Sequence, residues 1–265
     1  MNPPGKIKVA LFLFIWAVIG MPFAQSEGHE AGKDVDWSGV ALDEKLGKKV
    51  PRDAVFLDEH GDKITVGSYI DRPVLVLPIY YTCPQTCGLL LGNLASALND
   101  VPLTPGKDFK VLSLSIDEED NPSNALQAKK NYLKILKRSF ADDDWKFLTG
   151  DIKTIRRFTD AAGYGFKRTG GRNFVHPNVL IVLARDGTII RYIYGPIFLP
   201  FDVGMALTEA TKGIPAISVR KLLAYCFSYE PKNKTYSFRL VQILSLGFLV
   251  LLGIMFFFLL RKKKV

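Results

Sequence analysis

The stretch Val74–Cys87, VLVLPIYYTCPQTC, decides the fold. It opens with a continuous apolar run, Val74–Tyr80, which is typical of a strand buried on both faces. Two cysteines, Cys83 and Cys87, follow at once, and a helix is expected over Pro84–Leu98. In an open α/β sheet, reactive groups gather where a buried strand ends. The sequence therefore predicts that this junction carries the chemistry of the protein.

Outward from this junction, the sequence predicts an α/β domain with a mixed sheet. Three more helices are expected, after Asn121-Pro122 and over Asp151–Ala162 and Pro200–Thr211. Four more strands are expected, over Lys110–Ile116, Trp145–Leu148, Val179–Ala184 and Thr188–Tyr194. The turn Arg185-Asp186-Gly187 joins the last two strands and is a strong hairpin signal.

The charge of the chain is concentrated at its ends. The 265 residues carry a formal net charge of +9, with 35 basic and 26 acidic residues. Six of the basic residues lie in two short tails, at Lys6, Lys8 and 261–264, where no acidic residue accompanies them. The rest of the chain is nearly balanced, so the charge indicates membrane topology and excludes a nucleic-acid-binding face.

The two apolar ends predict export and anchoring. Residues 1–26 resemble a secretory signal peptide, with two lysines before a 13-residue apolar run, Val9–Met21. Leu240–Leu260 has no charge and is long enough for a transmembrane helix. We expect a linker at 27–50, the folded domain at 51–225, a juxtamembrane segment at 226–239 and a cytoplasmic tail at 261–265. The domain would face the periplasm or cell exterior, most simply in a bacterium.

The spacing of the two cysteines leaves three interpretations open. On a helix, residues four apart share one face, so Cys83 and Cys87 could bind one soft metal ion such as Cu(I) or form a redox dithiol. A helix N-terminus would also stabilise a thiolate, most of all at Cys83. The third interpretation is purely structural: both cysteines only extend an apolar stripe with Leu90, Leu91 and Leu94.

Of the three histidines, His176 is the candidate site residue. His29 and His60 lie in polar segments and are expected to be solvated, whereas His176 precedes a predicted strand and is followed by Pro177. Asp117, at the end of the second strand, could orient His176 but is more simply a cap. Cys226 is expected to be a buried or free thiol near the membrane. The basic run Lys129, Lys130, Lys134, Lys137, Arg138 is expected to be a solvated helix face.

From about Val40 to Tyr236 the chain resembles the Sco/SenC family of copper proteins. The motifs that carry the resemblance are Tyr81–Cys87 (YTCPQTC), Leu112–Asp117 (LSLSID), Trp145–Gly150 (WKFLTG), the single His176, and Cys226–Pro231 (CFSYEP) before a C-terminal span. The resemblance implies a thioredoxin-like fold and a copper site formed by Cys83, Cys87 and His176. Two departures bear on the loop geometry: Gly88 stands where the family usually has proline, and Pro177 where it more often has a small residue.

The resemblance also implies a function in the assembly of cytochrome c oxidase. The main hypothesis is a membrane-anchored metallochaperone that binds one copper ion and delivers it to the copper-bearing subunit, which is transfer and not catalytic turnover. The alternative is a thiol–disulfide oxidoreductase that reduces the cysteines of that copper site, with Cys83 attacking and Cys87 resolving. A peroxide-reducing enzyme is a third hypothesis that no feature requires. A periplasmic copper donor or thiol reductase would be a further partner.

Overall fold

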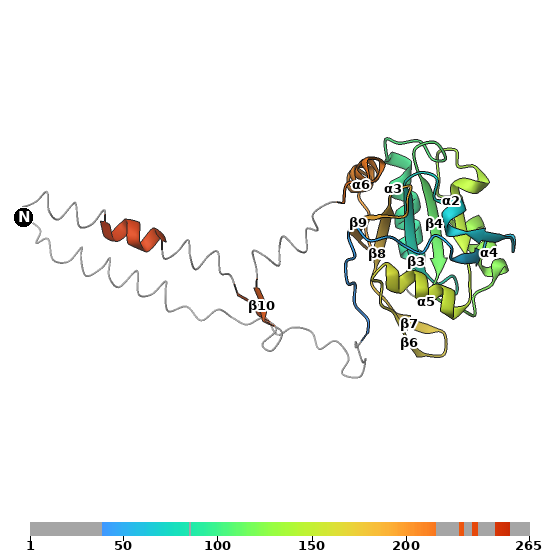
Figure 1. The fold of residues 1–265 in the computed structure, drawn as a ribbon, viewed down its shortest axis with the longest axis horizontal. Helices are drawn as coiled ribbons and strands as arrows, with labels where there is room; N and C mark the ends of the chain where they lie inside the picture. The colour runs from blue at the N-terminus through green and yellow to red at the C-terminus, as the bar shows by residue number, and fades with distance from the viewer. Residues whose placement is uncertain (1–38, 85, 216–227, 231–234, 238–246, 255–265) are drawn as a thin grey trace, which may run out of the picture. The chain divides into compact units, whose positions relative to one another are not determined.

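A five-stranded mixed sheet forms the centre of the computed structural model, which describes residues 39–84, 86–215, 228–230, 235–237 and 247–254 (Figure 1). The strand order is β5-β4-β3-β8-β9. β3 (Val74–Ile79), β4 (Lys110–Ser115) and β5 (Trp145–Leu148) run parallel to one another. β8 (Val179–Leu183) is antiparallel to β3, and β9 (Ile189–Tyr194) is antiparallel to β8. The mixed sheet predicted from the sequence is confirmed.

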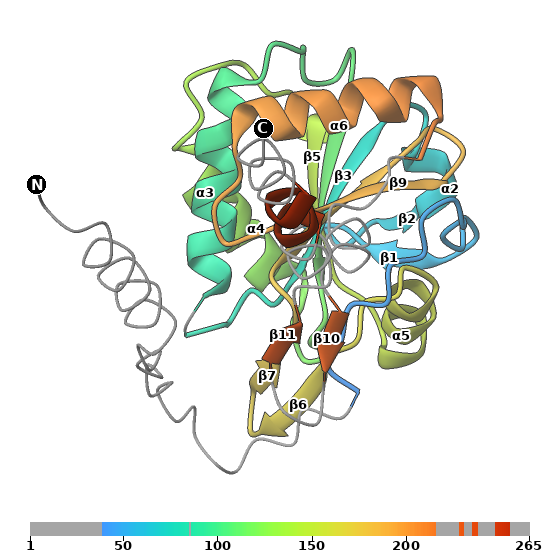
Figure 2. The same cartoon turned by 90° about the vertical axis from the view of Figure 1, so that its left-hand side faces the viewer.

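Helices cover both faces of this sheet (Figure 2). α3 (Cys87–Asp100) packs against α4 (Pro122–Leu133) and α6 (Pro200–Lys212), while α5 (Ile152–Ala161) covers the opposite face. Every residue of β3 is buried, as a central strand between two covered faces requires. The carboxyl end of β3 leads through the loop 80–86 to the first turn of α3.

Local capping signals in the sequence set the boundaries of these elements. Asn121 caps α4 by accepting hydrogen bonds from the backbone of Ser123 and Asn124, with Pro122 as the first helical residue. Asp151 caps α5 by accepting from Lys153 and Thr154. In the β8–β9 turn, Gly187 has φ +84°, a conformation that residues with a side chain rarely adopt. The predicted Asn121-Pro122 cap and the predicted hairpin are confirmed.

Several short elements have no counterpart in the sequence prediction. They are β1 (Val55–Leu57), β2 (Lys63–Thr65), α2 (Val66–Tyr69), β6 (Lys167–Gly170), β7 (Asn173–Val175) and the 3₁₀ turn η1 (Asp142–Asp144). β1 pairs with β2, and β6 pairs with β7, as two antiparallel hairpins. Each strand has three or four residues, too few for a period-two pattern to stand out. The β6–β7 hairpin matters for the site because His176 follows it directly.

The N-terminal boundary of the domain lies earlier than residue 51. The sequence predicts a linker up to Val50, but Leu42 bridges to Tyr164 and Lys49 bridges to Thr188. Val50 itself is buried. Residues 42–50 run along the domain with their backbone groups hydrogen-bonded, which their polar, glycine-containing sequence did not indicate.

The expectations for the two ends of the chain fall mostly on residues outside the described ranges. The predicted signal peptide, Cys226 and the tail at 261–265 lie there entirely. Within the segment expected to be juxtamembrane, β10 (Ser228–Glu230) pairs antiparallel with β11 (Thr235–Ser237). Residues 247–254, inside the predicted span, are helical. No helix among the described residues combines the length and the apolar character that crossing a membrane needs.

The basic run at 129–138 is solvated only in part: Lys130, Lys134 and Lys137 are exposed, as the sequence predicts, but Lys129 and Arg138 are not. α4 ends at Leu133, and Lys129 on it is buried, with its ammonium bound to Glu59 and Asp142. Arg138 lies beyond the helix and donates hydrogen bonds to the carbonyls of Leu98, Val101 and Leu103. The prediction was wrong for these two cations because their partners come from distant parts of the sequence.

Candidate metal and thiol site

The two cysteines lie on either side of the start of α3, not on one helical face. Cys87 is the first residue of α3, with Thr86 at the N-cap, and Cys83 lies in the preceding loop. The helix therefore begins three residues later than predicted, and the argument from residues four apart on a helix does not apply. The backbone N–H of Cys83 donates to the Tyr80 carbonyl at 3.4 Å, which turns the loop back toward the end of β3.

The two sulfurs nevertheless face each other. Cys83 and Cys87 are both thiols, and their side chains are hydrogen-bonded to one another. Cys83 is half-buried, whereas only 1% of Cys87 is exposed. The hydrogen bond from Cys83, followed by burial, raises the pKa of the Cys87 thiol well above its usual range. In the metal-free protein Cys87 is thus a protonated, enclosed thiol, and Cys83 is the sulfur that solvent and partners can reach.

The imidazole of His176 completes the group from the other side. Its Nε2 lies 3.6 Å from Cys87 Sγ. Its Nδ1 lies 2.8 Å from the hydroxyl oxygen of Tyr164 and 3.1 Å from the carbonyl oxygen of Pro177. Burial lowers the pKa of His176, which favours the neutral ring. With Nδ1 carrying the proton toward these oxygens, the Nε2 lone pair is left facing the thiol pair.

Aromatic side chains form the wall behind the three groups. The ring of Tyr80, at the end of β3, meets Phe174 at 5.1 Å and His176 at 6.1 Å between centroids. The Tyr80 hydroxyl is hydrogen-bonded to Cys83, and burial together with this bond raises the pKa of the phenol. The β6–β7 hairpin is therefore packed onto the strand that leads to the cysteines.

Asp120, in the loop after β4, fixes the cysteine loop. Its carboxylate accepts a hydrogen bond from the backbone of Tyr81 at 2.6 Å and from the hydroxyl of Thr82 at 3.2 Å. It also accepts from the Ser115 hydroxyl at 2.7 Å. Because Asp120 is almost fully buried, these bonds replace its lost hydration. The two residues that precede Cys83 are thus held by one carboxylate.

The loop after β4 also holds the β6–β7 hairpin, which precedes His176, through two arginines of that hairpin. Arg168 lies 2.8 Å and Arg172 2.9 Å from the carboxylate of Asp117, whose side chain is fully buried. Arg172 also reaches Asp120 at 2.8 Å. Among the described residues, no contact joins Asp117 to His176. The Asp117 carboxylate accepts a hydrogen bond from the backbone N–H of Glu119, as a capping residue does, and hydrogen bonds from Arg168 and Arg172. Asp117 therefore acts on His176 only through the hairpin.

Of the three residues that the sequence singled out, the structure places Cys87 in contact with both others, His176 and Cys83. Among the described residues, their three ligand atoms do not all lie within 4.8 Å of one another. The structure adds Tyr164, Asp120 and Arg172, which sequence reasoning missed. One signal was available, since the acidic run 117–120 and the arginine-containing run 167–172 have opposite charge. Nothing in the sequence indicated that Tyr164, just beyond α5, would reach His176.

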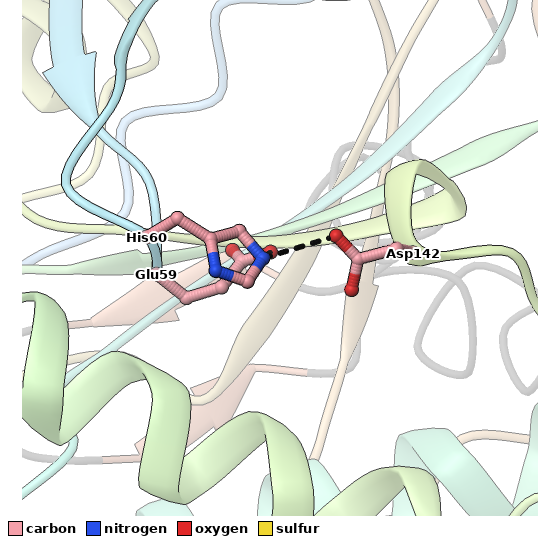
Figure 3. A group of neighbouring side chains, drawn as sticks. All are labelled: Glu59, His60 and Asp142. Atoms are coloured by element: carbon pink, nitrogen blue, oxygen red, sulfur yellow. Dashed lines mark hydrogen bonds and ion pairs between the residues drawn. The ribbon is translucent and has the colours of Figure 1, made fainter.

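A second group of polar side chains lies apart from this site. Glu59, His60 and Asp142 place one ligand atom each within 4.8 Å of one another (Figure 3). His60 Nε2 lies 3.1 Å from Asp142 Oδ2, so His60 has a carboxylate partner in addition to the solvent that the sequence predicts for it. The ammonium groups of Lys129 and Lys146 already neutralise these carboxylates, which makes the group an ion-pair network.

Comparison with solved structures identifies the fold. A protein of Aquifex aeolicus VF5, named as an electron transfer candidate, is 30% identical over 64% of this chain and 96% of its own, with a TM-score of 0.56. BsSco, named as a member of the Sco family of cytochrome c oxidase assembly proteins with a disulfide switch, is 19% identical over 64% of this chain and 97% of its own, with a TM-score of 0.53. Arabidopsis thaliana ScoI with copper bound is 15% identical over 60% of this chain and 96% of its own, with a TM-score of 0.50.

Sequence comparison identifies the family. No curated protein matches the chain. The family described as SCO1/SenC matches residues 43–196, which is more than half of the chain and includes both cysteines, His176 and the carboxylate loop. On this match and the fold, the chain belongs to the SCO1/SenC family.

Proposed function

We propose that the protein is a copper metallochaperone for the assembly of cytochrome c oxidase, with Cys83, Cys87 and His176 as the ligands of its cargo. The observation that carries the proposal is the contact of Cys87 with the two other groups: its Sγ lies 3.6 Å from His176 Nε2, and its thiol interacts with that of Cys83. Two thiolates and a neutral imidazole suit soft Cu(I) and leave Zn(II) one ligand short of its usual four.

The burial of these groups favours holding the ion and handing it on. Cys87 and His176 are enclosed, whereas Cys83 is partly exposed and can be approached by an acceptor. An acceptor thiolate could replace Cys83 first while Cys87 and His176 still hold the ion. The relatives named above support the cargo and the destination, since ScoI from Arabidopsis thaliana was solved with copper and BsSco belongs to an oxidase assembly family.

The experiment compares copper binding in the full-length protein and in His176→Ala. Both proteins are reduced, loaded anaerobically with Cu(I) and titrated against a competing chelator. We expect one tightly bound copper per chain, weakened by at least tenfold in the variant because one of three ligands is lost. Equal affinity in the two proteins would show that His176 is not a ligand.

Thiol–disulfide exchange is the second candidate function, and the asymmetry of the two cysteines favours it. The Cys83 thiolate would attack a partner disulfide, forming a mixed disulfide and releasing one partner thiolate. Cys87 would then attack the Cys83 sulfur, so that the second partner thiolate leaves and Cys83–Cys87 becomes the disulfide. The partner gains the two electrons that this protein loses. His176→Ala should leave this exchange mostly intact, which separates it from copper transfer.

We also propose that the protein is exported and anchored by Leu240–Leu260, with the domain outside the cytoplasmic membrane. The pattern of charges supports this: lysines precede the first apolar run, and residues 261–264 follow the second. Protease added to the outer side of the membrane should digest the domain and spare the C-terminal tail. A domain protected from that protease would contradict the proposed topology.

A further inference from the structure

The outer face of α6 is apolar at its start and basic at its end. α6 packs against β8, β9 and α3 and lies on the outside of the domain (Figure 2). The residues on its inner face are buried: Val203, Gly204, Ala206, Leu207 and Ala210. Exposed residues repeat at helical spacing on the opposite face: Phe201, Met205, Thr208 and Lys212. Phe201 and Met205 thus stand at positions where a helix that only covers a sheet carries polar residues.

The loop before α6 extends this apolar surface. Ile197 is 68% exposed and Phe201 is 75% exposed, and Leu199 between them is exposed as well. The loop is tied to α3, because Asn93 donates a hydrogen bond to the carbonyl oxygen of Pro196 at 2.9 Å. Four exposed side chains form what we call the apolar patch: Ile197, Leu199, Phe201 and Met205. Single exposed apolar residues are common on proteins, whereas a cluster of them marks a contact surface.

A basic pocket lies at the other end of α6. Its volume is about 450 Å³, and it is lined by the last turns of α6 and by the loops before β3, before β4 and after β8. Lys107, Arg185 and Lys212 line this pocket, and none of the three has an ion-pair partner in the part of the chain that the structure describes. The lining holds four basic and two acidic side chains, so its net charge is +2.

The two carboxylates of the basic pocket already have partners. Asp71 is paired with Arg72 at 2.8 Å and with Lys110 at 3.2 Å. Asp108 accepts a hydrogen bond from the backbone N–H of Thr104 at 2.7 Å. The three unpaired cations are therefore available to an external anion, and phosphate is an anion that both lysine and arginine bind well.

We propose that the outer face of α6 rests on a lipid bilayer, with the apolar patch in its interfacial region and the basic pocket on the phosphate of an anionic headgroup. Apolar side chains beside unpaired cations are the composition of segments that lie in a membrane interface. Charge complementarity favours this occupant, because an anionic bilayer offers acyl chains and phosphate in one surface. The inference deepens the proposed anchoring and rests on it for the bilayer, since α6 ends 28 residues before Leu240.

The loop that carries the apolar patch also contacts both segments of the thiol site. The backbone N–H of Gly195 donates to the carbonyl oxygen of Asn178 at 2.8 Å, two residues after His176. A Cβ built on Gly195 would stand 2.9 Å from the side chain of Leu90, three residues after Cys87. Contact of the apolar patch with a bilayer would therefore hold the thiol site near the membrane surface in one orientation.

The experiment places a fluorescent reporter in the apolar patch of the full-length protein. Phe201→Trp is reconstituted in vesicles of phosphatidylglycerol and phosphatidylcholine with brominated acyl chains, because bromine quenches indole only at short range. Ile152→Trp is the matched control, an exposed apolar position on α5, which covers the opposite face of the sheet. The unaltered protein, with its own three tryptophans, gives the background. We expect blue-shifted emission and quenching that is stronger by about twofold or more in Phe201→Trp than in the control.

A second comparison tests the basic pocket. In the Phe201→Trp background, the pocket variant carries Lys107→Gln, Arg185→Gln and Lys212→Gln. Its control lowers the net charge equally by changing three exposed lysines on other parts of the surface to glutamine: Lys63, Lys130 and Lys134. We expect the pocket variant to lose the extra quenching that phosphatidylglycerol gives over pure phosphatidylcholine, and the control to keep it.

The possible outcomes separate this inference from the proposed anchoring. Equal quenching of Phe201→Trp and Ile152→Trp would overturn the inference, and so would equal quenching of the pocket variant and its control. A blue shift of Phe201→Trp that needs no lipid and grows with protein concentration would also overturn it, because a second copy would then cover the patch. Extraction of the protein from the vesicles by alkaline carbonate would contradict the anchoring alone, since the quenching is measured beforehand. The Cu(I) titration is independent of both.

Discussion

Arg172 and Asp120 form the bond that joins the two halves of the site. The guanidinium of Arg172, on the β6–β7 hairpin, lies 2.8 Å from Oδ1 of Asp120, whose Oδ2 accepts the backbone N–H of Tyr81 at 2.6 Å. One carboxylate thus connects the hairpin before His176 to the loop before Cys83. Since Cys87 and His176 come from segments almost ninety residues apart, this connection helps to fix their relative position.

Arg172→Ala should loosen the hairpin and destabilise the fold. The variant removes one partner each from two buried carboxylates, Asp117 and Asp120, and we expect a loss of about 1–2 kcal/mol in the free energy of unfolding. Faster amide exchange should appear at Asn173–Val175. The control is Arg157→Ala, which breaks an exposed ion pair with Asp53 and should lower the free energy of unfolding much less. Equal losses in the two variants, measured by urea unfolding, would contradict the proposed bridging role.

Tyr164→Phe should disturb His176 without touching the thiols. The hydroxyl 2.8 Å from Nδ1 orients the ring, and loss of such a contact typically weakens metal binding by about 10- to 100-fold. The imidazole ¹⁵N shifts of the metal-free protein should show a mixture of tautomers in place of one. Tyr194→Phe, which removes a hydroxyl bonded to the half-buried Glu44, is the control and should leave both readouts unchanged.

Alkylation should distinguish the two cysteines by rate. Cys83 is half-buried and Cys87 is 1% exposed with a raised pKa, so limiting N-ethylmaleimide should modify Cys83 first, by at least tenfold. Peptide mapping by mass spectrometry separates these sites from Cys226. Faster labelling of Cys87 would contradict the assignment of Cys83 as the attacking thiol. In denaturant the two rates should converge.

Asp142 should give part of the acid sensitivity of the fold. Its hydrogen bond to Lys129 lowers the pKa of this carboxyl from 3.8 to about 2. The folded state therefore binds fewer protons than the unfolded state between these values, and the contribution of Asp142 to stability is lost as the pH falls from about 4 to 2. In Asp142→Asn, the free energy of unfolding should fall less steeply over that range.

The sequence predicts the large elements well, because their signals are local. The buried run at 74–80, the Asn121-Pro122 cap and the Arg185–Gly187 turn all depend on residues within one element. The position of Cys83 before α3, and not on it, depends on Asp120, whose carboxylate comes from the far end of β4. A pattern within one segment cannot report a hydrogen bond to another segment.

The prediction of the candidate site from the sequence is limited in the same way, because contacts between distant segments leave no local pattern. Cys83, Cys87 and His176 could be identified from residue type, spacing and family resemblance, since few side chains offer sulfur or imidazole. The residues that hold them, Tyr164 and Arg172, are of common types on short or irregular segments, and only the folded chain shows what they contact. The hairpin at 167–175 escaped prediction because its strands are short and polar.

The arginine–carboxylate contacts of the β6–β7 hairpin make the two halves of the site respond differently to ionic strength. The side chains of Arg168 and Arg172 are 29% and 39% exposed, so dissolved ions can screen their attraction to Asp117 and Asp120. The bonds from Asp120 to the cysteine loop are short and buried, and screening reaches them little. Rising salt should therefore weaken the contacts that hold the hairpin before it weakens the bonds that hold the cysteine loop.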